Sequence, residues 1–190
     1  TRCRGFKESE DRTNVPDIYH DADLTKFDFD IYVMDLSSLK KICESFLKEF
    51  ETRWQKQGMG LYLWSKTPGS GKTFLACCLG KSVMIKYGIR FKFINCVDYI
   101  SKVSESYKSD VVDDPSAIYR ECELLVLDDI GAQLSKEWQH EQIYKLVNER
   151  MVRGLVTIFT SNYSVENLNT DETGYFSNGM VYISDINTNG

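Results

Sequence analysis

The segment LYLWSKTPGSGKT, residues 61–73, contains the clearest structural signal in the chain. It begins with a short apolar run over residues 61–64, which is typical of a buried strand. A glycine-containing turn follows, and residues 74–87 then predict a helix that Gly88 ends. A strand, a glycine-rich turn and a helix in this order are the context of a phosphate-binding loop. The alternative, a chance glycine-rich turn, is the weaker interpretation because both flanking elements are present.

Each part of this loop suits a nucleoside triphosphate with Mg²⁺. Gly69 and Gly71 let backbone N–H groups approach phosphate oxygens without interference from side chains. Lys72 is placed to reach the β- and γ-phosphates, and the Thr73 hydroxyl to ligate Mg²⁺. The residues that we predict to hold ATP or ADP are Lys66, Thr67, Pro68, Gly69, Ser70, Gly71, Lys72, Thr73 and Phe74. Lys66 stands where the general pattern has glycine, so it either strains the loop entry or adopts a φ that lysine tolerates.

Polar residues follow two further apolar runs. Residues 124–127 lead into Asp128 and Asp129, and residues 156–160 lead into Ser161 and Asn162. In a parallel sheet the carboxyl ends of the strands face the ligand crevice. We therefore predict that Asp128 holds Mg²⁺ through a water, that Asp129 orients or deprotonates the attacking water, and that Asn162 holds this water or senses the γ-phosphate. Solvated loop carboxylates and an ordinary turn asparagine are the alternatives.

The predicted catalytic residues are therefore Lys72, Asp129 and Asn162, and the predicted metal ligands are Thr73 and Asp128. Asp129 is one methylene shorter than a glutamate would be, and phosphoryl transfer depends strongly on positioning. We expect ATP hydrolysis to be slow and dependent on a partner.

The rest of the chain alternates helices with strands. Apolar residues at steps of three and four predict an amphipathic helix over residues 35–54. A further strand is expected at residues 91–94, and further helices at residues 97–107, 116–122 and 137–152. This alternation predicts βαβ units and an α/β fold with a mostly parallel sheet. Residues 1–34 read as an extension or linker and 35–190 as the core, with no clear assignment for its part from residue 161 onward.

Composition limits the classes of protein. The 190 residues suit one domain, and 42% hydrophobic with 27% charged residues is typical of a soluble globular chain. The net charge of −5 argues against a strongly basic DNA-binding protein. The absence of a long apolar run or a signal-peptide pattern predicts a cytoplasmic protein without a membrane partner. The chain starts at Thr1, so we expect a piece of a longer protein.

The six cysteines form no C-x-x-C pair. A zinc site or a disulfide framework is therefore the less favoured interpretation. Free thiols in a reducing compartment are expected instead.

These residues resemble a known family. The segments LYLWSKTPGSGKTFLA, LLVLDDIGA and TIFTSNYSVENL are similar to those of AAA+ ATPases of the DnaC/DnaI type, the replicative helicase loaders. The related IstB transposition ATPases share much of the pattern. The resemblance runs from about residue 16 to residue 168 and includes VPDIYHDADLTKFDFDIY. It implies a three-layer αβα P-loop fold, with Lys72 and Thr73 as Walker A residues, Asp128 and Asp129 as the Walker B pair, and Asn162 as sensor 1.

The resemblance also implies partners. Loader subunits associate in the ATP state, grip single-stranded DNA and place or open a replicative helicase. By resemblance we expect self-association, single-stranded DNA, and a helicase contacted through an N-terminal domain outside this sequence.

One family feature has no counterpart near the end of the chain. AAA+ proteins usually supply an arginine to the neighbour's γ-phosphate, but residues 163–190 contain no Arg or Lys. Either residues are missing from the sequence, which we favour, or Arg150 or Arg153 substitutes, or the protein binds ATP without completing a partner's site.

A surface for DNA is suggested by the helix over residues 97–107. Lys102 and the nearby Lys108 alternate with Tyr99 and Tyr107, and basic residues interleaved with aromatic ones bind single strands. A solvated amphipathic helix is the favoured alternative, because aspartates follow in the next loop.

The sequence thus favours the ATPase core of a helicase loader. The alternatives are an IstB-like transposition ATPase and a nucleotide-gated interaction module with little hydrolysis. A small-molecule kinase is less favoured because the C-terminal stretch offers no basic lid residues.

Overall fold

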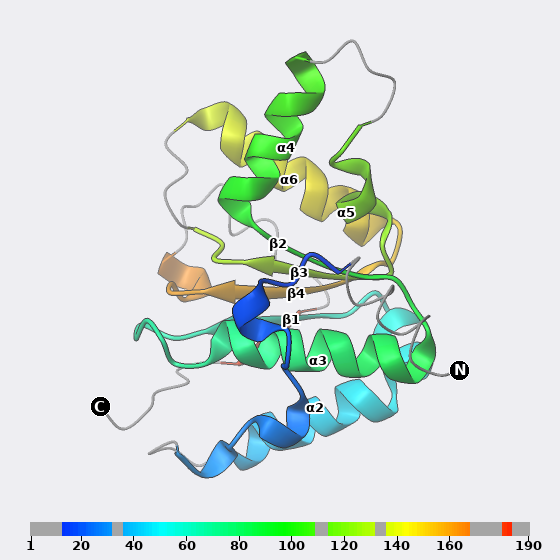
Figure 1. Cartoon of the computed structure of the whole chain (residues 1–190), viewed down its shortest axis with the longest axis vertical. Helices are drawn as coiled ribbons and strands as arrows, with labels where there is room; N and C mark the ends of the chain where they lie inside the picture. The colour runs from blue at the N-terminus through cyan, green and yellow to red at the C-terminus, as the bar shows by residue number, and fades with distance from the viewer. Residues whose placement is uncertain (1–12, 32–35, 109–113, 132–135, 168–179, 184–190) are drawn as a thin grey trace.

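The computed structural model describes residues 13–31, 36–108, 114–131, 136–167 and 180–183. Its centre is a parallel sheet of five strands in the order β2-β3-β4-β1-β5 (Figure 1). The strands are β1 Gly60–Trp64, β2 Phe91–Asn95, β3 Leu124–Asp128, β4 Val156–Ser161 and β5 Met180–Ile183. The predicted parallel sheet is therefore confirmed. The sequence did not predict β5, which pairs with β1.

Helices cover both faces of the sheet. They are α2 Ser37–Lys48, α3 Lys72–Tyr87, α4 Cys96–Lys108, α5 Ala117–Glu121 and α6 Glu137–Val152. Figure 1 shows α2 and α3 on one side, and α4, α5 and α6 on the other. The predicted helices and strands between residues 61 and 161 agree with the observed ones to within two residues at each end. No helix of the described ranges is both long and apolar enough to cross a membrane.

The alternation of side chains along each strand produces two hydrophobic cores. In β3, Leu124 and Val126 pack with α2 and α3 in one core. Leu125 and Leu127 point to the opposite face and pack with α4, α5 and α6 in the other. All four are fully buried, which explains the continuous apolar run in the sequence. The three-layer αβα fold is therefore confirmed.

The amphipathic helix predicted over residues 35–54 is formed by two segments. After α2 the chain widens into a π-helical turn, η4 Phe50–Gln55, in which hydrogen bonds span five residues. Phe46, Phe50 and Trp54 remain buried on one side, and the Phe46 ring lies 5.4 Å from that of Phe50 and 5.0 Å from that of Trp54. The change of helix type thus keeps a continuous aromatic face on the core.

The segment before α2 packs on α3 through short turns. These turns are η1 Asp17–Tyr19, η2 Leu24–Lys26 and η3 Phe29–Ile31. Ala22 and Phe27 are buried against α3, and Lys81 Nζ of α3 donates a hydrogen bond to the His20 carbonyl. The division between an extension of residues 1–34 and a core of 35–190 stays a prediction.

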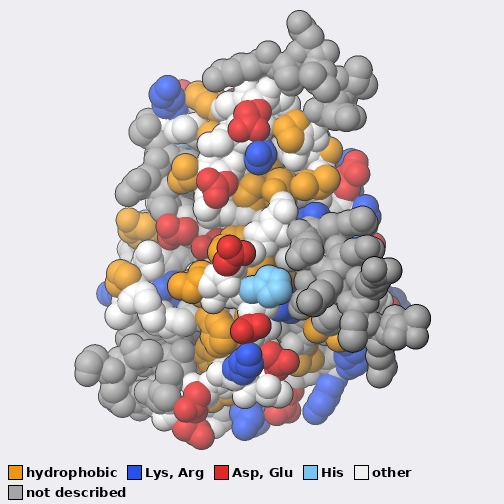
Figure 2. Space-filling model, in the orientation of Figure 1, with side chains coloured by type: hydrophobic (Ala, Val, Ile, Leu, Met, Phe, Trp, Pro, Cys, Tyr) orange, Lys and Arg blue, Asp and Glu red, His pale blue; other side chains and the backbone are white. Residues whose placement is uncertain are grey.

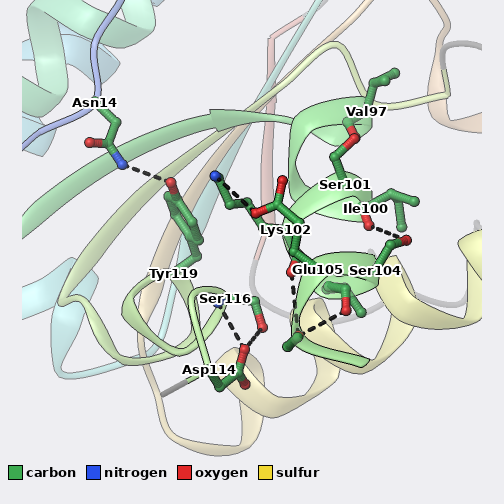
Figure 3. Close-up of polar contacts among 12 residues, drawn as sticks. Asn14, Val97, Ile100, Ser101, Lys102, Ser104, Glu105, Asp114, Ser116 and Tyr119 are labelled. Carbon is green, nitrogen blue, oxygen red and sulfur yellow. Dashed lines mark hydrogen bonds and ion pairs between the residues drawn. The ribbon is translucent and has the colours of Figure 1, made fainter. Parts of the chain in front are cut away.

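A polar cluster fixes α5 against α6. Asp114 accepts hydrogen bonds from Ser116 (Figure 3) and is paired with Arg120, whose Nε lies 3.4 Å from Glu149 Oε2 of α6. Burial raises the pKa of Asp114, but the hydrogen bonds from Ser116 and Arg120 outweigh it and lower this pKa to about 2. The Asp114 carboxylate therefore stabilises the folded state over most of the pH range.

The cysteines in the described part of the chain are buried, and they form no disulfide with one another. They are Cys43, Cys77, Cys78, Cys96 and Cys122. Burial raises the pKa of Cys43 and of Cys78 to about 12, so these thiols stay protonated at neutral pH. Cys3 lies outside the described residues. Within those ranges, no group of three or more His, Cys, Asp or Glu side chains gathers as a metal site.

Candidate functional site

A cavity of about 380 Å³ lies where β1, β3 and β4 end. It combines the loop after β1, the first residues of α3, the polar ends of β3 and β4, and one residue of η1. The lining residues are Tyr19, Pro68, Gly69, Ser70, Gly71, Lys72, Thr73, Phe74, Asp128, Asp129, Thr160 and Asn162. All the predicted catalytic and metal-binding residues therefore share one cavity.

The loop after β1 adopts a conformation that depends on glycine. Gly69 has φ 76° and Gly71 has φ 85°, both in the left-handed region that other residues rarely adopt. Gly71 also directly precedes α3, so the free N–H groups and the positive dipole end of that helix face the loop. Such a loop and helix start form a binding site for phosphate oxygens.

Lys66 occupies its position without left-handed backbone. Among the described residues, only Asn14 and Asp129 are non-glycine residues with positive φ. Lys66 therefore adopts a φ that lysine tolerates, as the second of the two interpretations has it, and does not strain the loop entry. Lys66 and Thr67 are exposed and do not line the cavity, whose wall on this loop starts at Pro68.

Lys72 is held inside the loop. It is only 7% exposed, and its Nζ lies 3.4 Å from Ser65 O, 3.2 Å from Thr67 O and 3.1 Å from Ser70 Oγ. Burial lowers the pKa of Lys72, and the charges of Asp129 and Asp128 oppose this shift. The loop thus places a partly desolvated cation beside the acidic end of β3.

Asp128 connects the loop to β4. Its Oδ1 accepts a hydrogen bond from Thr73 Oγ1 at 2.8 Å and another from Thr160 Oγ1 at 2.6 Å. Burial raises the pKa of Asp128, and these two hydrogen bonds oppose the shift. A hydroxyl and a carboxylate oxygen side by side are the hard ligands that Mg²⁺ prefers, so the residues present fit this ion.

Asp129 and Asn162 lie on the solvent side of the same cavity. Asp129 has φ 58°, a left-handed conformation that aspartate adopts more readily than most residues. Asn162 Nδ2 lies 3.5 Å from Asp129 Oδ1. A carboxylate and an amide so arranged have the chemistry to hold a water molecule between them and a phosphate.

Two lining residues were missed at the level of sequence. Tyr19 reaches the cavity from η1, more than 40 residues before the loop, and its ring centroid lies 6.4 Å from that of Phe74. Burial raises the pKa of Tyr19, and the nearby Asp128 adds to this shift. No local pattern marks Tyr19. Thr160 was seen only as the last residue of a strand, although its polar side chain at a strand end was the available signal.

The prediction that Arg150 could supply the arginine for a neighbour's γ-phosphate was wrong, because Arg150 is buried in its own subunit. Its side chain is 1% exposed and donates hydrogen bonds to the carbonyls of Tyr119, Cys122 and Val156 and to Thr157 Oγ1.

Arg153 differs from Arg150, because its side chain is 47% exposed, and its role as the substitute stays a prediction. Arg153 follows α6 just before β4 begins, at the edge of the sheet opposite the cavity, and pairs with Glu149 at 2.8 Å.

The predicted DNA surface on α4 is corrected in one respect. Tyr99 is 2% exposed and cannot stack on a base, whereas Tyr107 is 75% exposed. Lys102 Nζ lies 3.3 Å from Glu105 Oε2, and this pair is visible in Figure 3. The side chain of Lys108 is not among those that the structure describes. On the face drawn in Figure 2, basic and acidic side chains are interspersed. The favoured alternative, a solvated amphipathic helix, agrees with these contacts.

Comparison with known proteins adds the family. Residues 3–172 match the model of the family described as IstB-like ATP binding protein. The chain is 28% identical over 125 residues to the replicative helicase loader DnaI of Bacillus subtilis (strain 168), an overlap that covers 65% of this chain and 39% of DnaI. It is 26% identical over 114 residues to the chromosomal replication initiator protein DnaA of Buchnera aphidicola subsp. Baizongia pistaciae (strain Bp), covering 60% of this chain and 25% of DnaA. The chain thus spans less than half the length of these relatives.

Solved structures show the same fold. A crystal structure of the DnaC helicase loader superposes with a TM-score of 0.75 and 22% identity, covering 90% of this chain and 99% of that one. A crystal structure of DnaI gives a TM-score of 0.72 and 21% identity, covering 90% and 95%. Because the family model covers most of the chain, the resemblance seen in the sequence is confirmed: this protein belongs to the IstB-like ATP binding proteins, and it is similar to the helicase loaders DnaI and DnaC.

Proposed function

We propose that this chain is the ATP-binding and ATP-hydrolysing core of a DNA replication helicase loader, which couples its ATP state to engagement of single-stranded DNA and a replicative helicase. The observation that carries the ATPase part is the 2.8 Å hydrogen bond from Thr73 Oγ1 to Asp128 Oδ1. This contact joins the phosphate loop to the acidic strand end inside one cavity. The loader part rests on similarity to proteins named as helicase loaders.

The loop would bind the phosphates of ATP or ADP. The N–H groups around Gly69 and Gly71 and the first turn of α3 would donate to the phosphate oxygens. Lys72 would leave its contacts with the loop carbonyls and turn to the β- and γ-phosphates, which are stronger acceptors. Phe74 lines the cavity next to the loop, with its ring centroid 6.4 Å from that of Tyr19 and 6.3 Å from that of Phe27, and would cover the nucleoside.

Thr73 and Asp128 would hold Mg²⁺ through their oxygen atoms. When bound, this ion would supply the positive charge that neutralises the phosphate oxygens. Asp129 would orient or deprotonate the attacking water, and the Asn162 amide would hold that water or sense the γ-phosphate. Their 3.5 Å contact supports a joint role.

Hydrolysis by this chain alone would be slow. Residues 163–190 contain no Arg or Lys, and Arg150 is committed to the core. The charge that stabilises the transition state would therefore come from a partner protein or from Arg153 of a second copy of the chain. The same observation favours a second candidate, a nucleotide-gated interaction module that binds ATP and hydrolyses little. An IstB-like transposition ATPase would use the same site with a different partner.

The test is ATP hydrolysis with and without a single-stranded oligonucleotide. Lys72→Ala should lower turnover by roughly two to three orders of magnitude, as the loss of one transition-state donor does. Lys145→Ala is the matched control, since Lys145 pairs with Glu141 on α6 and both side chains are more than half exposed. DNA-stimulated turnover that disappears in Lys72→Ala supports the loader. Tight ATP binding without turnover under either condition would favour the interaction module, and absence of nucleotide binding would refute both.

A further inference from the structure

Thr160 contacts both residues of the acidic strand end. Its Oγ1 donates to Asp128 Oδ1 at 2.6 Å and accepts the backbone N–H of Asp129 at 2.9 Å. A hydroxyl has one proton and two lone pairs, so it makes both contacts at once. Thr160 is 2% exposed, which protects both hydrogen bonds from water.

These contacts replace a regular continuation of the sheet. β3 and β4 pair in register from Leu124↔Val156 to Leu127↔Phe159. The left-handed conformation of Asp129 then turns the chain, and the N–H of the next residue, Ile130, reaches the Thr160 carbonyl at 2.9 Å. The Asp129 N–H donates its hydrogen bond to the Thr160 hydroxyl and not to a main-chain carbonyl. Irregularities of this kind at the end of a strand re-aim side chains.

Ser161 closes the irregular segment. Its Oγ donates to the Ile130 carbonyl at 2.8 Å and accepts the N–H of Tyr163 at 3.0 Å. The end of β4 therefore fixes the backbone on both sides of Asp129, and also the turn that carries Asn162.

We propose that Thr160 is a positioning residue for ATP hydrolysis. Its hydroxyl orients the carboxylate of Asp128 and stabilises the left-handed backbone that directs Asp129 into the cavity. This inference rests on the proposed ATPase function and adds a residue to it. Because Thr160 acts through the carboxylate of Asp128 and the backbone of Asp129, its loss should affect turnover and Mg²⁺ dependence more than nucleotide affinity.

Two substitutions separate this role from simple packing. Thr160→Val keeps the shape and the β-branch of the side chain but removes the hydroxyl, whereas Thr160→Ser keeps the hydroxyl and removes a methyl group. In Thr160→Val we expect kcat to fall roughly tenfold to a hundredfold, as for a slightly misplaced catalytic group. The Kd for ADP without Mg²⁺ should stay within about threefold of the parent. Thr160→Ser should recover most of the turnover, despite its smaller contribution to packing.

A second measurement does not depend on ATP. Hydrogen exchange of the Asp129 amide in the nucleotide-free protein should be faster in Thr160→Val by roughly tenfold or more, because its acceptor is gone. Exchange of the Ile130 amide, which bonds the main-chain carbonyl of residue 160, should change less, and Thr160→Ser should resemble the parent.

The outcomes distinguish failure of this inference from failure of the proposed function. If the parent hydrolyses ATP and Thr160→Val does so at the same rate, the positioning role is overturned. An unchanged hydrogen-exchange rate of the Asp129 amide in Thr160→Val would overturn it as well. If the parent shows no turnover, the hydrolytic function fails. The Thr160 inference is then decided by amide exchange and by whether Thr160→Val raises the Mg²⁺ concentration needed for tight ATP binding.

Discussion

Replacing Arg150 with alanine should lower the free energy of unfolding by about 3–5 kcal/mol, the range seen when one member of a buried charged network is removed. The guanidinium lies 2.7 Å from Tyr119 O, 2.9 Å from Cys122 O and 2.7 Å from Val156 O, so it joins the end of α5 and the start of β4 to α6. The variant removes the guanidinium donor from these carbonyls, of which Tyr119 O keeps a weak donor in Cys122 Sγ at 3.7 Å.

The magnitude follows from opposing contributions. Each buried carbonyl left unsatisfied costs about 1–3 kcal/mol, and the cavity left by the side chain adds about 1–2 kcal/mol. Release of the desolvated cation offsets part of this, since burial lowers the pKa of Arg150 and thus disfavours its charged form. For a chain of this size the net loss corresponds to about 10 °C in Tm.

The assay is urea unfolding followed by tryptophan fluorescence, with nucleotide affinity measured on the folded protein. Arg153→Ala is the matched control. Its ion pair with Glu149 is about half exposed, so its loss should cost less than about 1 kcal/mol. Nucleotide affinity should change little in either variant. A stability loss below about 1 kcal/mol in Arg150→Ala, or a loss of turnover without a loss of stability, would refute the structural role and restore Arg150 as a catalytic candidate.

Three further predictions concern other parts of the chain. Asp114→Asn should destabilise the protein by about 1 kcal/mol at neutral pH after allowance for solvent screening. Because the folded pKa of Asp114 is lowered to about 2, this contribution is present above the unfolded pKa and is lost as the pH falls toward 2, where the urea midpoints of variant and parent should converge. Gly80→Ala should lose about 1–3 kcal/mol in thermal unfolding, since a Cβ there would lie 2.4 Å from the buried ring of Phe91. Tyr19→Ala should weaken binding of a fluorescent ATP analogue by roughly threefold to tenfold, and Tyr19→Phe should not, because the ring forms the wall of the cavity.

Local patterns predicted most elements of the fold correctly. The helix over residues 137–152 has the same bounds in the structure, and β1, β2, β3 and β4 lie where the apolar runs were. Hydrophobic period and glycine position are properties of neighbouring residues, so they are readable without knowledge of the fold. The change to a π-helical turn at Phe50 and the short strand β5 were not readable in this way. Each depends on what the segment packs or pairs with, and β5 forms a strand because it lies beside β1.

The residues of the candidate site could also be predicted from local sequence, whereas their arrangement follows from the fold. Lys72, Thr73, Asp128, Asp129 and Asn162 were predicted because each stands at a strand end or in a loop whose sequence shows its chemistry. Their roles await the experiments above. That they line one cavity follows from the parallel sheet, whose strands all end at the same edge.

The remaining features depend on distances across the sheet, which sequence spacing does not contain. Only the pairing of β3 with β4 brings the Thr160 hydroxyl between the Asp128 carboxylate and the Asp129 amide. Only the packing of η1 on α3 brings Tyr19 to the loop, and only the burial of α6 turns Arg150 from a possible surface cation into part of the core. Sequence period shows which face of an element is apolar, but which polar atoms meet is decided by strand order and layer packing.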